Sequence, residues 1–186
     1  DERFGGNMLR KAIDYFCHLA VDPAFYGQLS SKDHEFMASE YADKLKWLKD
    51  DYENIYDPDY NDMLRVSFMH QFGRGKLGDL VSLLSGRDFI ERTFKEEIAQ
   101  ESFEKLTAGV INFMNKYTFE QFVLAIKSAG FINPKQLNSK MTLDFAYTLY
   151  LLLNSDKEFP KVEIKPCVQK WFILSTLTGR YIGSPE

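Results

Sequence analysis

One glycine-rich segment carries residue types that could bind a phosphate. Gly73-Arg74-Gly75-Lys76-Leu77-Gly78 matches the pattern G-x-G-x-x-G, in which bare backbone approaches a pyrophosphate at the start of a helix. That chemistry needs a preceding β-strand, and no βαβ pattern surrounds this segment. Two other interpretations stay open: an inter-helix turn, or a turn whose Arg74, Lys76 and backbone N–H groups hold a phosphate of a nucleic acid or nucleotide.

A second segment begins like a calcium-binding loop. In Asp57-Pro58-Asp59-Tyr60-Asn61-Asp62, the sixth position of an EF-hand loop would be a sharply turning glycine, and here it is Asp62. The twelfth position would supply a bidentate carboxylate, and here it is Phe68. We therefore interpret the acids as the start of a helix, with Asp57 as its cap and Pro58 in its first turn.

The histidines and cysteines show no spacing typical of a metal site. None of His18, His34 and His70 lies four residues from another, and no cysteine pair has metal-ligand spacing. Cys17 beside His18 has no identifiable third residue that would orient the histidine for nucleophilic catalysis. We therefore expect no catalytic residue, no metal and no cofactor.

The C-terminal segment Lys170–Ser184 combines rings, a glycine and an arginine. Its pattern predicts an aromatic-rich helix that ends at Gly179 and is followed by Arg180 and Tyr181 in a turn. A cation at a helix C terminus interacts favourably with the helix dipole. Two interpretations stay open: a C-cap that locks the last helix onto the core, or a contact between Arg180 and a ligand or phosphate.

Apolar residues recur at helical spacing along nearly the whole chain. The pattern predicts an all-α protein, a single bundle-like domain of about eight to ten helices without a confident strand. We expect helices at 8–20, shortly after 22–23, at 36–52, 63–72, 77–84, 88–117, 118–129, 141–153 and from 165 to the glycine at 179.

Several local signals set the expected helix ends. Thr118-Phe119-Glu120-Gln121 has the order of a capping box, and Asp88 is a candidate cap for the preceding helix. Ser85-Gly86 and Gly130 are expected stops. The run from Met63 to Phe72 is ambiguous, since its apolar residues alternate as in a half-buried strand, but no partner strand is evident.

Length and composition exclude several classes of protein. The chain has 186 residues, 45% hydrophobic, 27% charged and 15% aromatic, with a net charge of −4, which is typical of a globular domain with a ring-rich core. We find no uninterrupted apolar run of roughly 18 residues, the length that a membrane-spanning helix needs, and no signal-peptide pattern. Two cysteines suit a reducing compartment, so a cytoplasmic location is expected. Turn residues at Ile182–Glu186 suggest that residues 1–186 are one helical domain cut from a longer multidomain chain.

Charge is unevenly distributed. Ser31–Asp62 holds ten acids and four bases, Met63–Lys95 six bases and three acids, and Lys157–Ile182 five bases and two acids. Solvated helix faces produce similar fluctuations. The alternative is contact with nucleic-acid phosphates, for which the candidate residues are Arg74, Lys76, Arg87, Arg92, Lys170 and Arg180.

From Trp171 to Ser184 the chain resembles the motif W-F-x-x-S-x-L-T-G-R-Y-x-G-S of the domain-of-unknown-function-262 family. The matching residues include Trp171, Ser175, Gly179, Arg180, Tyr181, Gly183 and Ser184. The segment Met141–Tyr147 and the Gly-Arg-Gly turn are also similar to the helical portion of that family. Its members include GmrS/GmrD-type modification-dependent restriction proteins and phage-defence proteins, in which a ParB-like nucleotide-hydrolysing domain precedes a helical region and often a His-Asn-His nuclease domain.

The family's catalytic motifs, Asp-Gly-Gln-Gln-Arg and His-Asn-His, are absent from this sequence. The resemblance therefore implies a non-catalytic helical region that couples an NTPase-like domain to a nuclease domain of the parent chain and contacts double-stranded DNA. The net negative charge favours an alternative, a structural or oligomerisation module without nucleic-acid binding. A third hypothesis is an enzyme with an unrecognised site near Gly73–Gly78. No membrane partner is expected, and the oligomeric state stays open.

Overall fold

The computed structural model describes residues 55–88, 92–131, 133, 136–137 and 139–181. Within this part of the chain the protein contains six α-helices and no strand, which confirms the all-α prediction. The helices expected before residue 55 lie outside the described residues. The six helices are α3 (Tyr60–Phe72), α4 (Leu77–Leu84), α5 (Glu96–Phe113), α6 (Lys116–Ser128), α7 (Met141–Ser155) and α8 (Lys161–Leu177).

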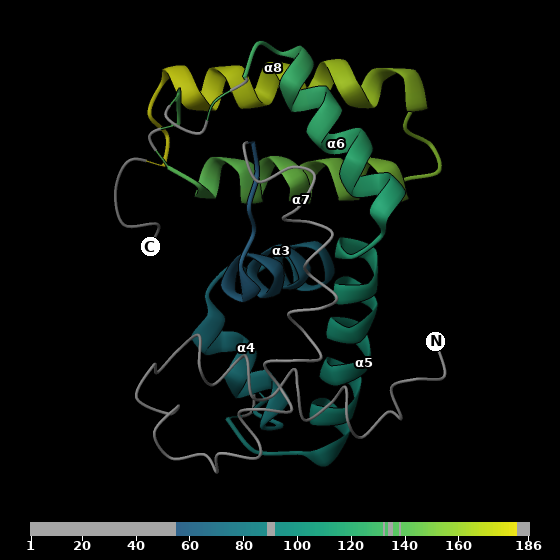
Figure 1. Cartoon of the computed structure of the whole chain (residues 1–186). Helices are drawn as coiled ribbons and strands as arrows, with labels where there is room; N and C mark the ends of the chain where they lie inside the picture. Colours follow the sequence, from purple (N-terminus) through teal and green to yellow (C-terminus); the bar gives the residue numbers. More distant parts are fainter. Residues whose placement is uncertain (1–54, 89–91, 132, 134–135, 138, 182–186) are drawn as a thin grey trace, which may run out of the picture.

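The helices pack around α3 and α7. Figure 1 shows α7 and α8 lying along each other, with α6 crossing them and α5 standing beside α3 and α4. Helix α3 packs against α4, α5 and α7, whereas α8 packs against α6 and α7. Within the described region, no helix has the length and apolar character needed to cross a membrane.

Helix α3 is buried on nearly all sides, which explains its ambiguous sequence pattern. Leu64, Val66 and Phe68 are fully buried, and so is the intervening Ser67. The helix prediction for this run is therefore confirmed. Its cap is Asp59 rather than Asp57, because Asp59 accepts hydrogen bonds from the N–H groups of residues 61 and 62 in a capping box.

The described residues between α4 and α5, 85–88 and 92–95, fold back on each other, where a helix from Asp88 was expected. The Lys95 N–H donates to the Gly86 carbonyl at 2.8 Å, and the Asp88 N–H donates to the Thr93 carbonyl at 2.8 Å. The carboxylate of Asp88 pairs with the ammonium of Lys95 at 3.6 Å instead of capping a helix. Helix α5 therefore begins at Glu96, and it ends at Phe113 rather than near residue 117.

Two further helix starts differ from expectation. Helix α6 begins earlier than the expected capping box at Thr118, because Asn115 caps it by accepting the Thr118 N–H at 3.0 Å. Helix α8 begins at Lys161, directly after Pro160, so that Pro166 lies inside the helix rather than at its start. The predicted stops are confirmed, since Gly86 and Gly130 have φ values of +89° and +91°, where glycine is favoured.

The centre of the core is a group of rings from four segments, which pack in stacked, tilted and edge-to-face pairs. Its members lie with ring centroids 4.8–6.4 Å apart, which is the range of favourable aromatic pairs. The rings belong to Tyr56, Phe113, Phe119, Phe122 and Tyr147. The residues just before α3 are thereby held against α6 and α7.

Candidate functional site

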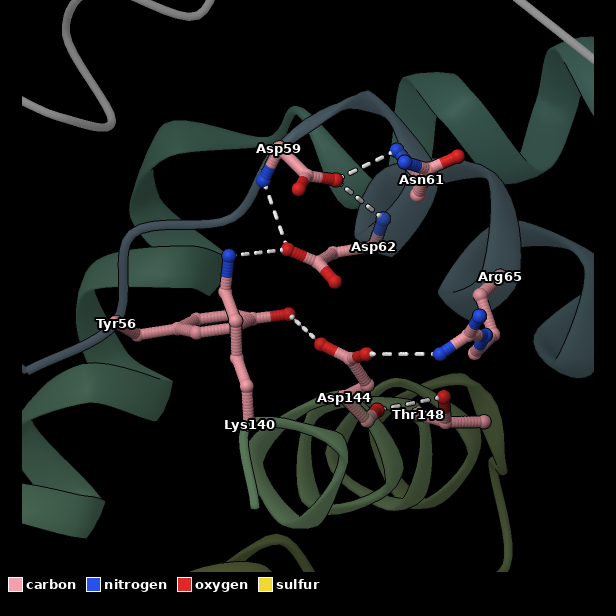
Figure 2. A network of polar contacts seen from close by, with 8 residues as sticks. All are labelled: Tyr56, Asp59, Asn61, Asp62, Arg65, Lys140, Asp144 and Thr148. Carbon is pink, nitrogen blue, oxygen red and sulfur yellow. Dashed lines mark hydrogen bonds and ion pairs between the residues drawn. The ribbon is translucent and has the colours of Figure 1, made fainter. Parts of the chain in front are cut away.

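The most buried carboxyl group in the described part of the molecule is that of Asp144, on α7. Its Oδ1 accepts a 2.8 Å hydrogen bond from the hydroxyl of Tyr56. Its Oδ2 lies 3.9 Å from the guanidinium of Arg65 on α3 and has no hydrogen-bond partner. Figure 2 shows the three side chains meeting between α3 and α7.

A second carboxylate lies beside this group. Asp62 accepts a hydrogen bond of 2.8 Å from the backbone N–H of Asp59, and its side chain is 2.5 Å from the ammonium of Lys140 (Figure 2). Lys140 immediately precedes α7, so the ion pair joins the starts of α3 and α7. Thr148 donates its hydroxyl proton to the backbone carbonyl of Asp144 at 2.9 Å.

The electrostatics of this network favour a proton on Asp144. Burial, and then the charge of Asp62, raise the pKa of Asp144 to about 8, although Tyr56, Arg65 and Lys140 act in the opposite direction. Burial and the neighbouring Asp144 raise the pKa of Tyr56 well above its ordinary value. Burial lowers the pKa of Lys140, but the contacts with Asp62 outweigh it and the net direction is upward.

Chemically, Asp144 is an acid that keeps its proton near neutral pH, a property typical of both catalytic and structural sites. It has no exposed surface, so the geometry gives a substrate no route to it. The network instead connects the segment before α3, α3 itself and α7. Asp144 is the only acid in the apolar run 141–153, and this feature could have marked it as a candidate from the sequence alone. Its partner Tyr56, 88 residues away, could not be deduced.

His70 forms a polar pair with Ser155 that sequence analysis did not identify. Its Nε2 lies 3.4 Å from the Ser155 hydroxyl, and its Nδ1 lies 2.9 Å from the side-chain amide nitrogen of Gln71. Which ring nitrogen donates and which accepts in these two contacts depends on the tautomer of His70. Burial lowers the pKa of His70.

The glycine-rich segment forms the turn between α3 and α4. It follows a helix rather than a strand, which contradicts the dinucleotide-loop pattern. Gly73, at φ +66°, ends α3 in the left-handed conformation. The guanidinium of Arg74 lies 3.4 Å from the carboxylate of Asp79, and Lys76 is exposed at the N-cap of α4. A phosphate contact by Arg74 and Lys76 stays a prediction.

The six basic residues that are candidates for contact with nucleic-acid phosphates lie in three regions. Arg87 and Arg92 are both exposed on the α4–α5 loop, where Arg92 has the left-handed φ of +58°. Lys170 is exposed on α8, and Arg180 is exposed just after it. The α4–α5 loop lies at the opposite end of the molecule from α8 (Figure 1). The structure therefore places Arg87 and Arg92 on the same loop, and not with Lys170 and Arg180.

The described part of the motif that resembles the domain-of-unknown-function-262 family, Trp171–Tyr181, includes the C-terminal cap of α8. Gly179 has φ +60°, and its N–H donates to the Thr176 carbonyl at 3.2 Å. The next N–H, of Arg180, donates to the Ser175 carbonyl at 3.1 Å. These two bonds define a Schellman motif, in agreement with the C-cap interpretation of the segment.

The aromatic residues of the same motif pack against neighbouring helices. The ring of Tyr181 stacks on Phe145 of α7 with 4.5 Å between centroids and 10° between planes. Trp171 lies 6.1 Å from the Tyr181 ring, and Phe172 is buried against Phe131 at 5.4 Å. Gly183 and Ser184 lie outside the described residues.

No family model, curated protein or solved structure matches this chain. Within the described ranges, no group of three or more histidine, cysteine, aspartate or glutamate side chains is arranged to hold a metal ion. Cys167 is a half-buried free thiol on α8. The resemblance to the restriction-type family therefore stays a prediction based on the motif.

Proposed function

We propose that this chain is the non-catalytic helical region of a cytoplasmic restriction-type or phage-defence protein, and that it couples an NTPase-like domain to a nuclease domain. The proposal is supported by one relationship on α7. Asp144 accepts a hydrogen bond from Tyr56, which precedes α3, while the next residue, Phe145, stacks on Tyr181, which follows α8. A single helix thus holds the segment before α3 and the segment after α8, as a coupling element requires.

The coupling works through rigid helices. The hydrogen bond to Tyr56 fixes the segment before α3, and the ring stack on Tyr181 fixes the segment after α8. A change at either segment must move α7 or break a buried contact, because packed interfaces resist continuous deformation. In this role the motif residues act by packing, and the chemistry belongs to other domains of the parent protein.

Hydrogen exchange tests this coupling in the full chain. Tyr181→Ala should increase amide exchange near residues 170–177 and also near residues 56–66, because both are anchored on α7. Leu152→Ala, at a position of α7 that is 45% exposed, is the matched control and should change neither region. Increased exchange confined to the end of α8 would show that the two ends are independent, and would contradict the proposal.

A second candidate function is contact with double-stranded DNA, and the α4–α5 loop favours it. This loop exposes Arg87, Arg92 and the ring of Phe94, which is 70% exposed. Fluorescence anisotropy with a short duplex should then show binding that weakens steeply with salt. Arg92→Gly removes the charge and suits the positive φ, so it should weaken binding without disturbing the loop. Absence of binding at low salt would leave the coupling role alone.

A further inference from the structure

Two buried carboxyl groups between α3 and α7 are unequally satisfied. The carboxylate of Asp62 accepts a hydrogen bond from the Asp59 N–H at 2.8 Å and lies 2.5 Å from the ammonium of Lys140. Asp144 has a partner for Oδ1, the hydroxyl of Tyr56 at 2.8 Å, whereas its buried Oδ2 has none among the described residues. An unsatisfied buried acceptor is costly, so a donor that reaches this oxygen would stabilise the fold.

The guanidinium of Arg65 faces this oxygen from α3 (Figure 2). It lies 3.9 Å away, which is close enough for an ion pair but too long for a hydrogen bond. The side chain of Arg65 is 24% exposed, so it is not locked in the core. A charge-assisted N–H···O hydrogen bond is about 2.7–2.9 Å long, so a movement of about 1 Å would form one.

The proton of Asp144 decides whether this movement is favourable. Because Oδ1 accepts the hydrogen of Tyr56, Oδ2 is the oxygen that carries the proton when the carboxyl is neutral. A guanidinium only donates, so Arg65 cannot accept that proton and gains little from a neutral carboxyl. Once the proton leaves, the same oxygen is an anionic acceptor. The 3.9 Å separation is the one expected for the protonated state.

The titratable and charged groups that face Asp144 come from three described segments. They are Tyr56 before α3, Asp62 and Arg65 on α3, and Lys140 directly before α7, and α6 and α8 add none to this set. Tyr56 remains a neutral donor because its pKa is raised well above its ordinary value. Lys140 remains charged because its pKa is raised too. Within this set, Arg65 is the group left to respond when Asp144 ionises.

We propose that Arg65 replaces the proton of Asp144 as the pH rises, so that the network is a pH-sensitive clamp between α3 and α7. In the neutral form, Oδ1 accepts from Tyr56 and Oδ2 carries the proton. In the ionised form, the proton has passed to solvent and the guanidinium donates to Oδ2. Each carboxylate then has its own cation, Lys140 for Asp62 and Arg65 for Asp144. The clamp goes beyond the coupling role and does not depend on it.

Nuclear magnetic resonance of the 186-residue chain tests this replacement directly. The carboxyl carbon signal of Asp144 reports its proton, and the guanidinium N–H signals of Arg65 report its hydrogen bonds. Both should change with the same midpoint, between about pH 6 and 10. Above the midpoint the Arg65 N–H groups should exchange with water more slowly than those of the exposed Arg92, although this exchange is base-catalysed and accelerates with pH.

Two substitutions separate the hydrogen bonds of Arg65 from its charge. Arg65→Gln should move the Asp144 midpoint upward by about 1 pH unit or more, which is a tenfold or larger change in proton affinity. Arg65→Lys keeps a cation without the planar fork of donors, so its midpoint should fall between those of the parent and Arg65→Gln. Arg87→Gln removes an exposed positive charge from the α4–α5 loop and is the control that should leave the midpoint unchanged.

Four results would overturn the clamp. They are an Asp144 carboxyl carbon that does not titrate in this pH range, Arg65 N–H signals that stay constant while it titrates, a midpoint that is unchanged in Arg65→Gln, and an equal displacement in Arg87→Gln. The titration of the parent chain needs no substitution, so the test holds even if an Arg65 variant fails to fold. Amide exchange in Tyr181→Ala, which tests the coupling role, succeeds or fails separately.

Discussion

The hydroxyl of Tyr56 donates a 2.8 Å hydrogen bond to the carboxyl of Asp144, although 88 residues separate them. Both side chains are buried, so this bond is shielded from water and cannot be replaced by solvent. It joins the segment before α3 to the middle of the fold. Its loss should therefore affect the stability of the whole described region.

Tyr56→Phe keeps the ring and removes the donor. The free energy of unfolding should fall by about 1–3 kcal/mol, because a buried carboxyl then loses its hydrogen-bond partner. Urea unfolding followed by circular dichroism measures the change. Tyr117→Phe, at a ring that is 71% exposed, should stay within about 0.5 kcal/mol of the parent chain. Equal stability of the Tyr56→Phe variant and the parent would show that the bond contributes little.

The stability of the protein should depend on pH through Asp144. Its pKa is raised from 3.8 to about 8 on folding, so between these values the folded state holds a proton that the unfolded state has released. The free energy of unfolding therefore falls as pH rises from about 4 to about 8, by up to roughly 1.4 kcal/mol per pH unit from this group. Above that range the contribution levels off.

Asp144→Asn isolates this effect, because the amide does not titrate. The stability of the parent chain minus that of the variant should decrease steadily with pH over the same range. Urea unfolding at pH 5, 6, 7 and 8 provides the comparison. Parallel curves for the two proteins would mean that Asp144 keeps an ordinary pKa in the folded state.

Replacing Gly179 and Gly78 by alanine should change the stability of the protein in opposite directions. Gly179→Ala should destabilise the protein by about 1–2 kcal/mol, because φ is +60° at this position. Gly78→Ala lies in the first turn of α4, where an added Cβ meets nothing within 4 Å. It should stabilise by about 0.5–1 kcal/mol. Thermal unfolding of the two variants side by side checks both signs.

Helix identity could be predicted from the sequence wherever local signals agree. Helix α4 and its stop at Gly86 follow from a short apolar run and a glycine, and both are confirmed. Helix starts were less predictable because neighbouring residues compete for the cap. Asn115 accepts the Thr118 N–H and so caps the helix in place of Thr118, and Pro166 lies inside α8, which begins five residues earlier, at Lys161.

The candidate site depended on contacts that no local pattern contains. Asp144 stands in a strongly apolar segment, which marks it as unusual, but its partners Tyr56 and Arg65 come from distant parts of the chain. In contrast, the C-cap at Gly179 was predictable from a glycine after an apolar helix. The stacking of Tyr181 on Phe145 required knowledge of how α7 and α8 pack.

The central claim is that the motif from Trp171 to Tyr181 acts by packing, and the unfolding free energies of two variants test it most directly. Tyr181→Ala removes the ring that stacks on Phe145 and should cost about 1–2 kcal/mol. Arg180→Ala removes an exposed side chain and should change stability by less than about 0.5 kcal/mol. A neutral Tyr181→Ala, or an Arg180→Ala variant that is equally destabilised, would contradict the account.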